Sequence, residues 1–246
     1  MSGSDSSTSR KSHFRFKKFA VAHANSTMKV GTDAVLLGAW ADISNGKRLL
    51  DIGTGNGTIA LMLAQRSDDD SKVDAVEIEK TDALLALDNF NQSPWPNKLQ
   101  VHHSSIQKFH PDRKYDVIVT NPPYFNNSQS PPDEKRYQAR HTIKLSHNDL
   151  TTAATRLMEA DGKLSVILPF EEGNQFIPIA RSKMLYCSRQ FAFRARHEKQ
   201  IERWLLEFRK QPRALETGEI ILYKNKTGEI WDDTYINLTR DFYLKL

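Results

Sequence analysis

The stretch Asn121-Pro122-Pro123-Tyr124 combines residue types that could position an amine for chemistry. Proline fixes φ, lacks an N–H and holds the preceding residue extended, so the Asn121 side-chain oxygen and the Pro122 carbonyl become rigid acceptors. An exocyclic amine has two N–H donors to match them, and Tyr124 offers an aromatic face for the ring. Held in this way, the amine lone pair could be aimed at an electrophilic methyl group. A proline-rich turn after a strand is the alternative interpretation.

A second pattern begins at Asp51, where an apolar segment ends in a loop with glycines at alternate positions, Gly53, Gly55 and Gly57, followed by the amphipathic stretch 58–66. This order predicts a strand, a loop and a helix. Glycine allows positive φ and a close backbone approach to a ligand. The spacing G-x-G-x-G differs from the G-x-G-x-x-G of dinucleotide-binding folds, so it favours a nucleoside ligand without phosphate. A tight turn without a ligand is the alternative.

Residues 73–78 are predicted to form another buried strand, with Glu77 at its carboxyl end. At this place in a doubly wound sheet, an acidic side chain can accept hydrogen bonds from both hydroxyls of a ribose. We therefore predict that Glu77 binds the sugar of the same nucleoside. The alternative is a solvated charge at a strand end.

Alternating strand-like and helix-like segments surround these motifs and must position them. A helix is predicted from a cap at Thr32, and four strand and helix units follow up to Thr120. Later segments are predicted as helices at 149–158 and 176–184 and as strands at 163–168, 186–193, 203–209 and 219–223, the last two as an antiparallel pair. The expected fold is α/β, a doubly wound Rossmann-like sheet that is mostly parallel with an antiparallel final strand.

One domain is expected from residue 14 to residue 246, because single α/β domains reach this size. Residues 1–13 are polar and low in complexity, which is typical of a disordered tail. Residues 125–147 hold few apolar side chains, two adjacent prolines and several basic residues. They predict a long substrate loop beside the Asn121 motif.

The composition excludes several classes of protein. Hydrophobic residues make up 39% of the chain, mean hydropathy is −0.58, and no apolar run approaches the ~18 residues of a membrane span. The polar N-terminus does not resemble a secretory signal, and the sole cysteine, Cys187, cannot form an internal disulfide. We expect a soluble, cytoplasmic and monomeric enzyme. Cys187 also lies far from any proline-cysteine loop, which excludes methylation of a pyrimidine carbon through a cysteine nucleophile.

The adjacent residues His102 and His103 raise the question of a metal site. Neighbouring residues of a strand face opposite sides. No cysteine or further histidine completes a ligand set around them. We therefore expect no metal.

Basic residues are concentrated in two segments. Between residues 181 and 213 there are ten lysines or arginines against three glutamates, while the whole chain has a net charge of only +5. The segment 10–19 interleaves basic residues with phenylalanines, a combination that binds single-stranded nucleic acid through phosphates and stacked bases. We predict RNA contacts by Lys17, Lys18, Arg194 and Arg196. A solvated charged surface is the alternative.

Together, the glycine loop and the Asn121 motif resemble class I S-adenosylmethionine-dependent methyltransferases that act on amino groups. Further segments resemble the bacterial tRNA1(Val) (adenine-N6) methyltransferase family. They are residues 16–23, 28–33, 36–40, 61–66, 91–95 and 241–244. The likeness extends from about residue 14 to the end of the chain.

The resemblance implies a reaction and its participants. The fold would be a class I methyltransferase sheet, the cofactor S-adenosylmethionine, and the substrate the N6 amino group of the adenosine at position 37, just 3′ of the anticodon in tRNA1(Val). The implied catalytic residues are Asn121, Pro122, Pro123 and Tyr124. The implied cofactor-binding residues are Asp51, Gly53, Gly55, Gly57, Glu77, Ser105, Ile106 and Asn121.

The chain departs from this family at Ser105, where the family usually has an aspartate that accepts from the adenine amino group of the cofactor. A hydroxyl can still accept that hydrogen bond, but it lacks the charge that would strengthen it. Ile106 would supply its backbone N–H to the adenine ring and its side chain to the apolar wall.

The Asn-Pro-Pro-Tyr motif alone does not select the substrate. Enzymes that methylate DNA adenine N6, rRNA guanine N2 or a protein glutamine share it, so these acceptors are alternatives. The glutamine enzymes carry a helical domain ahead of their glycine loop, and only 50 residues precede Asp51 here. A non-catalytic RNA-binding protein on the same fold is a further alternative, against which the intact Asn121 and glycine set argue.

Overall fold

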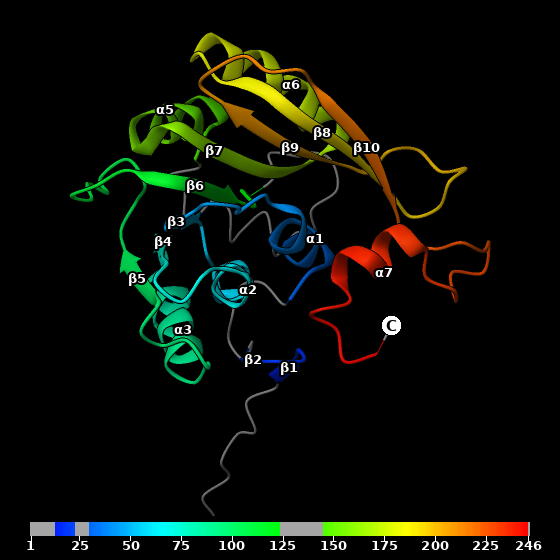
Figure 1. Ribbon diagram of the computed structural model, residues 1–246, viewed down its shortest axis with the longest axis horizontal. Helices are drawn as coiled ribbons and strands as arrows, with labels where there is room; N and C mark the ends of the chain where they lie inside the picture. Colours follow the sequence, from blue (N-terminus) through cyan, green and yellow to red (C-terminus); the bar gives the residue numbers. More distant parts are fainter. Residues whose placement is uncertain (1–12, 23–29, 124–144, 246) are drawn as a thin grey trace, which may run out of the picture.

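The computed structural model describes residues 13–22, 30–123 and 145–245, and its centre is an eight-stranded sheet with helices on both faces (Figure 1). The strand order is β10-β8-β9-β7-β6-β3-β4-β5. These strands are β3 (Arg48–Ile52), β4 (Lys72–Glu77), β5 (Leu99–His103), β6 (Tyr115–Thr120), β7 (Met158–Pro169), β8 (Tyr186–Arg194), β9 (Arg203–Arg209) and β10 (Glu216–Ile221). The helices are α1 (Thr32–Trp40), α2 (Thr58–Arg66), α3 (Lys80–Asn91), α5 (His147–Leu157), α6 (Phe170–Ser182) and α7 (Asp233–Thr239).

The parallel centre of the sheet is buried on both faces. β3 pairs in parallel with β4 and β6, and its successive residues Leu49 and Leu50 join two different core clusters because side chains alternate along a strand. α1, α2 and α7 contribute to the cluster that contains Leu49, whereas α5 and α6 contribute to the one that contains Leu50. The predicted doubly wound α/β fold is thereby confirmed. Across the described helices, none is long and apolar enough to cross a membrane.

β9 is the strand that runs against its neighbours. It pairs antiparallel with β7 on one side and β8 on the other, while β10 pairs in parallel with β8. A mostly parallel sheet with an antiparallel strand is therefore confirmed, but the predictions that 203–209 pairs with 219–223 and that the final strand is antiparallel are wrong. The reason is the short connection from β8 to β9, closed by a hydrogen bond of 2.9 Å from the Glu202 N–H to the Phe193 carbonyl. Since β9 has β7 on one side and β8 on the other, β10 cannot pair with β9 and pairs with the outer edge of β8.

Gly162 lies within β7, where this strand passes close to β6. α5 ends at Leu157, and β7 begins at the next residue. A Cβ at Gly162 would lie 2.5 Å from Cγ of Met158 and 3.1 Å from the carbonyl oxygen of Tyr115 on β6. Glycine is needed here for the close approach of these segments.

A two-stranded hairpin, formed by β1 (His13–Arg15) and β2 (Ala20–Ala22), packs against the C-terminal segment. Phe16 and Phe19 are 3% and 7% exposed, and their rings stack at 4.6 Å. Tyr243 lies 6.2 Å from Phe16, and the Lys17 N–H donates to the Phe242 carbonyl at 2.7 Å. The expectation that the phenylalanines of this segment stack on bases is therefore wrong for Phe16 and Phe19, because their apolar surface is buried in the core.

Candidate active site

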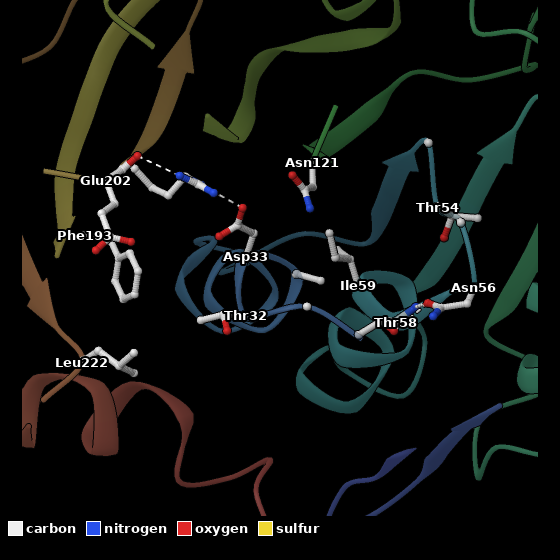
Figure 2. Close-up of a pocket in the computed structure, with 15 residues that line it drawn as sticks. Thr32, Asp33, Thr54, Asn56, Thr58, Ile59, Asn121, Phe193, Glu202 and Leu222 are labelled. Carbon is white, nitrogen blue, oxygen red and sulfur yellow. Dashed lines mark hydrogen bonds and ion pairs between the residues drawn. The ribbon is translucent and has the colours of Figure 1, made fainter. Parts of the chain in front are cut away.

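A pocket of about 420 Å³ lies along the edge of the sheet that holds the carboxyl ends of β3, β6 and β8, the usual ligand position in such sheets. Figure 2 shows its two ends, with the glycine loop, Asn56 and Thr58 on one side and Phe193 with Leu222 on the other. Asn121 lies over the middle, and its side chain points into the pocket. The first turn of α1 forms the wall below it.

The glycine loop has the backbone conformation that the sequence predicts. Gly53, Gly55 and Gly57 have φ of 71°, 56° and 85°, a region that L side chains rarely adopt. A Cβ built on Gly53 or Gly55 would meet no atom within 4 Å, so both face open space, and both line the pocket. A Cβ on Gly57 would instead lie 2.5 Å from the Phe90 ring. Gly53 and Gly55 thus provide a cradle for a ligand, and Gly57 allows the loop to pack on α3.

One carboxylate oxygen of Asp51 holds the glycine loop and the start of α2, and the other has no hydrogen-bond partner among the described residues. Its Oδ2 accepts from the Thr54 hydroxyl at 2.6 Å and from the Ala60 N–H at 3.1 Å. The residue is fully buried, and its Oδ1 has no hydrogen-bond partner among the described residues. Burial raises the pKa of Asp51 to about 7. A buried acceptor without a donor is costly, so a ligand that brings a donor or a positive charge to this end of the pocket would be stabilised.

Glu77 is tied to the same loop. It is 7% exposed, its Oε2 accepts from the Gly55 N–H at 2.8 Å, and its Oε1 accepts from the Glu79 N–H at 2.9 Å. Burial raises the pKa of this carboxyl above its ordinary value. The contacts give Glu77 a role in fixing the loop, while its predicted contact with a ribose stays a prediction.

The Asn-Pro-Pro segment leaves the sheet next to the glycine loop. The Thr120 hydroxyl donates to the Ile52 carbonyl at 2.9 Å and so joins the ends of β6 and β3. Asn121 therefore faces the same pocket as Gly53. Pro122 is buried and Pro123 is exposed. Tyr124 and residues 125–144 of the predicted substrate loop lie outside the described residues, as do residues 1–12 of the predicted tail.

Several pocket residues could not be assigned to the pocket from the sequence, although one of them, Asp33, lies in the segment 28–33 that resembles the family. The Arg203 Nε donates to the Asp33 carboxylate at 2.9 Å, which links the start of β9 to the first turn of α1. The Arg203 Nη1 also donates to the Glu202 carbonyl at 3.0 Å, as Figure 2 shows. Phe193, at the end of β8, adds an apolar wall. These partners are far apart in the chain, and only the sheet order brings them together.

Ser105 and Ile106 follow β5 and are not among the residues that line this pocket. Ile106 is 4% exposed, packs in the core cluster of α5 and α6, and its carbonyl accepts from Arg156 at 2.9 Å. Ser105 is half-buried, and its carbonyl accepts from the Lys108 N–H at 3.0 Å. Their predicted contacts with an adenine ring stay predictions.

The four residues predicted to contact RNA differ in their surroundings. Lys17 and Lys18 are exposed on the hairpin, and the Lys17 Nζ donates to the Arg240 carbonyl at 2.5 Å. Arg194 forms an ion pair with Glu219 and also donates to the Lys199 carbonyl at 2.6 Å. Arg196 lies 3.3 Å from a carboxylate oxygen of Glu198. Part of the positive charge of residues 181–213 is therefore balanced locally, and the RNA contacts stay predictions.

The two adjacent histidines have separate partners. Nε2 of His102 lies 3.0 Å from Oδ1 of Asp74, and Nε2 of His103 lies 3.1 Å from the Ile78 carbonyl. Within the ranges that the structure describes, no group of three or more His, Cys, Asp or Glu residues could hold a metal ion.

A doubly wound sheet with a glycine loop after β3 and an Asn-Pro-Pro segment after β6 defines the class of the protein as a class I methyltransferase. The family profile of the methyltransferase small domain matches residues 14–177. Curated relatives identify one family within this class. A protein of Aliivibrio salmonicida named tRNA1(Val) (adenine(37)-N6)-methyltransferase is 42% identical over 95% of this chain and 98% of its own length. A protein of the same name from Haemophilus influenzae is 40% identical over 95% of this chain and 99% of its own length.

The chain belongs to the tRNA1(Val) (adenine(37)-N6)-methyltransferase family. Solved structures agree on the fold. A crystal structure of a predicted O-methyltransferase from Agrobacterium tumefaciens superposes with a TM-score of 0.66 at 20% identity and covers 85% of this chain and 96% of that chain. A putative RNA methyltransferase from Pyrococcus horikoshii gives a TM-score of 0.51 at 14% identity and covers 72% of this chain and 79% of its own.

Proposed function

We propose that the protein transfers a methyl group from S-adenosylmethionine to the N6 amino group of adenosine 37 in tRNA1(Val). The observation that carries the proposal is that Asn121 points into the same pocket as Gly53 and Gly55. The acceptor for an amine and the cradle for a nucleoside are therefore within one cavity. The activity named for relatives about 40% identical over nearly the full chain supports this choice of substrate.

The residues present fit the cofactor. The open side of Gly53 and Gly55 leaves room for a ligand against the backbone, and the unused Oδ1 of Asp51 lies at the base of this loop. When bound, S-adenosylmethionine supplies an electrophilic methyl group on a sulfonium sulfur. We assign the ribose to Glu77 and the adenine to Ser105 and Ile106, which follow the neighbouring strands β4 and β5.

The chain contributes mainly by positioning the amine. The Asn121 side-chain oxygen and the Pro122 carbonyl accept its two N–H groups, so the nitrogen becomes more tetrahedral and its lone pair turns toward the cofactor end of the pocket. Tyr124 stacks on the extruded base. No strong base is needed, because the proton is lost afterwards from a cationic product. Positioning of this kind is worth roughly 7–11 kcal/mol in favourable cases.

The tRNA backbone is expected to contact Lys17, Lys18, Arg194 and Arg196, with the anticodon loop beside residues 125–147. The exposed lysines of the hairpin support this assignment. In this proposal the protein acts in the cytoplasm, where its tRNA substrate is found, and it acts as a monomer.

The test uses purified protein, S-adenosylmethionine with an isotope-labelled methyl group, and tRNA1(Val) transcribed in vitro. Mass spectrometry of the digested RNA is expected to show one N6-methyladenosine at position 37. A transcript with guanosine at that position and a DNA hairpin of the same sequence serve as controls and should take up no label. With the Asn121→Ala variant, labelling should be at least about a hundredfold slower. Label at another nucleotide, or equal label on the position 37 variant, would overturn the proposal.

A further inference from the structure

The side chain of Asn89 connects the N-terminal hairpin to the glycine loop. Asn89 lies on α3 and is 2% exposed. Its Oδ1 accepts from the Ala22 N–H at 2.9 Å. Its Nδ2 donates to the Ala22 carbonyl at 3.2 Å and to the Asn56 carbonyl at 2.8 Å. One carboxamide thus joins the N-terminal hairpin, residues 13–22, to the glycine loop.

Both ends of this link matter for the pocket. Asn56 is part of the glycine loop and lines the pocket, and its own Oδ1 accepts from the Thr58 hydroxyl at 2.7 Å at the start of α2. Ala22 is the last residue of β2 and is 2% exposed. The hairpin is held elsewhere by the C-terminal segment through Phe16 and Tyr243. In Figure 1 it is the blue pair of strands below α2.

The chemistry of the link requires a carboxamide. The two carbonyls need two N–H donors and the Ala22 N–H needs one acceptor, a combination that asparagine supplies at one position. A buried carbonyl that loses its donor is costly. An aspartate at this position would bring no donor and would place a charge against two carbonyl oxygens. A side chain of the same size without these two N–H donors would therefore leave the carbonyls of Ala22 and Asn56 without this hydrogen-bond donor.

We propose that Asn89 is a positioning residue that holds the glycine loop in its cofactor-binding shape by tying the Asn56 carbonyl to the docked N-terminal hairpin. Undocking of the hairpin then loosens the loop although the hairpin does not line the pocket. This inference deepens the proposed function, since it concerns how the chain prepares the cofactor site. It also gives the buried Phe16 and Phe19 a role beyond stability, because they keep the hairpin in place.

A pair of variants on one helix gives the first test. Asn89→Asp removes both donors, and Asn91→Asp, on the exposed end of the same helix, introduces the same charge without touching the link. Calorimetry with S-adenosylhomocysteine is expected to show at least about tenfold weaker binding for N89D and wild-type binding for N91D. Equal affinity in the two variants would overturn the proposal. Absence of binding in the wild-type protein would instead count against the proposed function.

A double-mutant cycle separates positioning from a general loss of stability. Asn89→Ala removes the link without adding charge, and Phe16→Ala loosens the hairpin from Tyr243. We expect each change to weaken S-adenosylhomocysteine binding, and the double variant to bind no more weakly than N89A alone, because the hairpin acts on the loop through Asn89. With saturating cofactor, N89A should keep kcat within about threefold of wild type while its KM for the cofactor rises. Additive losses, or an F16A variant with wild-type affinity, would overturn the proposal.

Discussion

The carboxylate of Glu77, at the end of β4, accepts a hydrogen bond of 2.8 Å from the backbone N–H of Gly55 in the loop after β3. Its second oxygen accepts from the Glu79 N–H at 2.9 Å. Both oxygens therefore act as acceptors for the backbone before any ligand is considered. Glu77, which the sequence predicts to bind a ribose, therefore also supports the glycine loop. The shape of this loop depends on both oxygens of Glu77 accepting hydrogen bonds from the backbone.

The Glu77→Gln variant tests that dependence. A carboxamide has one acceptor oxygen, so its NH₂ group must face the N–H of either Gly55 or Glu79. We expect the free energy of unfolding to fall by roughly 1–3 kcal/mol, the usual cost of a buried donor without a partner. Cofactor affinity should fall by at least about tenfold by calorimetry. Glu79→Gln is the control, because its backbone N–H is unchanged. Similar losses in both variants would contradict a specific role of the Glu77 carboxylate in holding the loop.

Asn121→Ala is expected to separate catalysis from cofactor binding. The substitution removes an acceptor that matters most as the transition state forms. Methyl transfer in a single turnover should fall at least about a hundredfold, while the affinity for S-adenosylhomocysteine stays within a few-fold of wild type. Asn121→Asp, which still offers an oxygen acceptor, should retain more activity than the alanine variant. Unchanged turnover in Asn121→Ala would remove this residue from the catalytic site.

Local sequence features were enough to predict the cradle and the place of Asn121. An apolar segment followed by alternate glycines predicts a strand and a loop with positive φ, and Gly53, Gly55 and Gly57 all have it. The family resemblance implies that Gly53 and Asn121 bind the same cofactor, and both line the pocket because parallel strands place their carboxyl ends at one edge of the sheet.

Long-range partners could not be predicted in the same way. Arg203 was counted as one basic residue among ten, but its Nε donates to Asp33, 170 positions earlier in the chain. That pairing depends on β9 lying between β7 and β8, which the sequence does not reveal. Phe16 shows a second limit. An aromatic residue in a basic segment has the same local pattern whether it stacks on RNA or, as here, packs against Tyr243.

Asp51 gives the protein a pH-dependent stability. Its pKa rises from 3.8 to about 7 on folding, so the folded state binds the proton more tightly. The stability that protonation contributes is complete below pH 3.8 and is lost as the pH rises through about 7. Above that pH, the buried carboxylate destabilises the ligand-free protein.

The Asp51→Asn variant should therefore be more stable than wild type at pH 8. The shift corresponds to roughly 4 kcal/mol for the ionised form, against roughly 1–3 kcal/mol for an amide N–H left without a partner. We expect Tm to rise by a few degrees at pH 8 and the difference to shrink toward pH 5. Circular dichroism melts at both pH values measure it. The same variant should bind the cofactor more weakly. A lower Tm at pH 8 would contradict the assignment of a raised pKa.

The ion pair between Arg203 and Asp33 is expected to stabilise the pocket wall. The two side chains are 28% and 18% exposed, so the pair is partly shielded from water. A double-mutant cycle with Arg203→Ala and Asp33→Ala should give a coupling of roughly 1 kcal/mol in the free energy of unfolding. Urea denaturation measures it. The exposed pair of Lys224 and Asp233 is the control and should couple more weakly. Equal coupling in the two pairs would mean that the partial burial of Arg203 adds nothing to the strength of the ion pair.

The predicted RNA contacts differ in how freely their charges can reach a phosphate. Lys17 and Lys18 are exposed on the hairpin, where the Lys17 Nζ donates to the uncharged carbonyl of Arg240 at 2.5 Å, whereas Arg194 is paired with the Glu219 carboxylate and Arg196 lies beside Glu198. Neutralising a contact lowers the salt dependence of binding by roughly 0.7–0.9 per phosphate lost. We expect the double variant Lys17→Gln, Lys18→Gln to weaken tRNA binding more than the double variant Arg194→Gln, Arg196→Gln.

Filter-binding titrations across a salt series can decide between these sites. Cofactor affinity should stay unchanged in both double variants, since none of the four residues lines the pocket. Lys72→Gln is the control. Lys72 lies at the amino end of β4, at the edge of the sheet opposite to the pocket, so this variant should keep the wild-type salt dependence of tRNA binding. If the lysine and arginine variants also kept wild-type slopes and affinities, both basic segments would be solvated surfaces. The tRNA contact would then have to be sought in residues 125–147, which follow the Asn-Pro-Pro motif in the chain and include several basic residues.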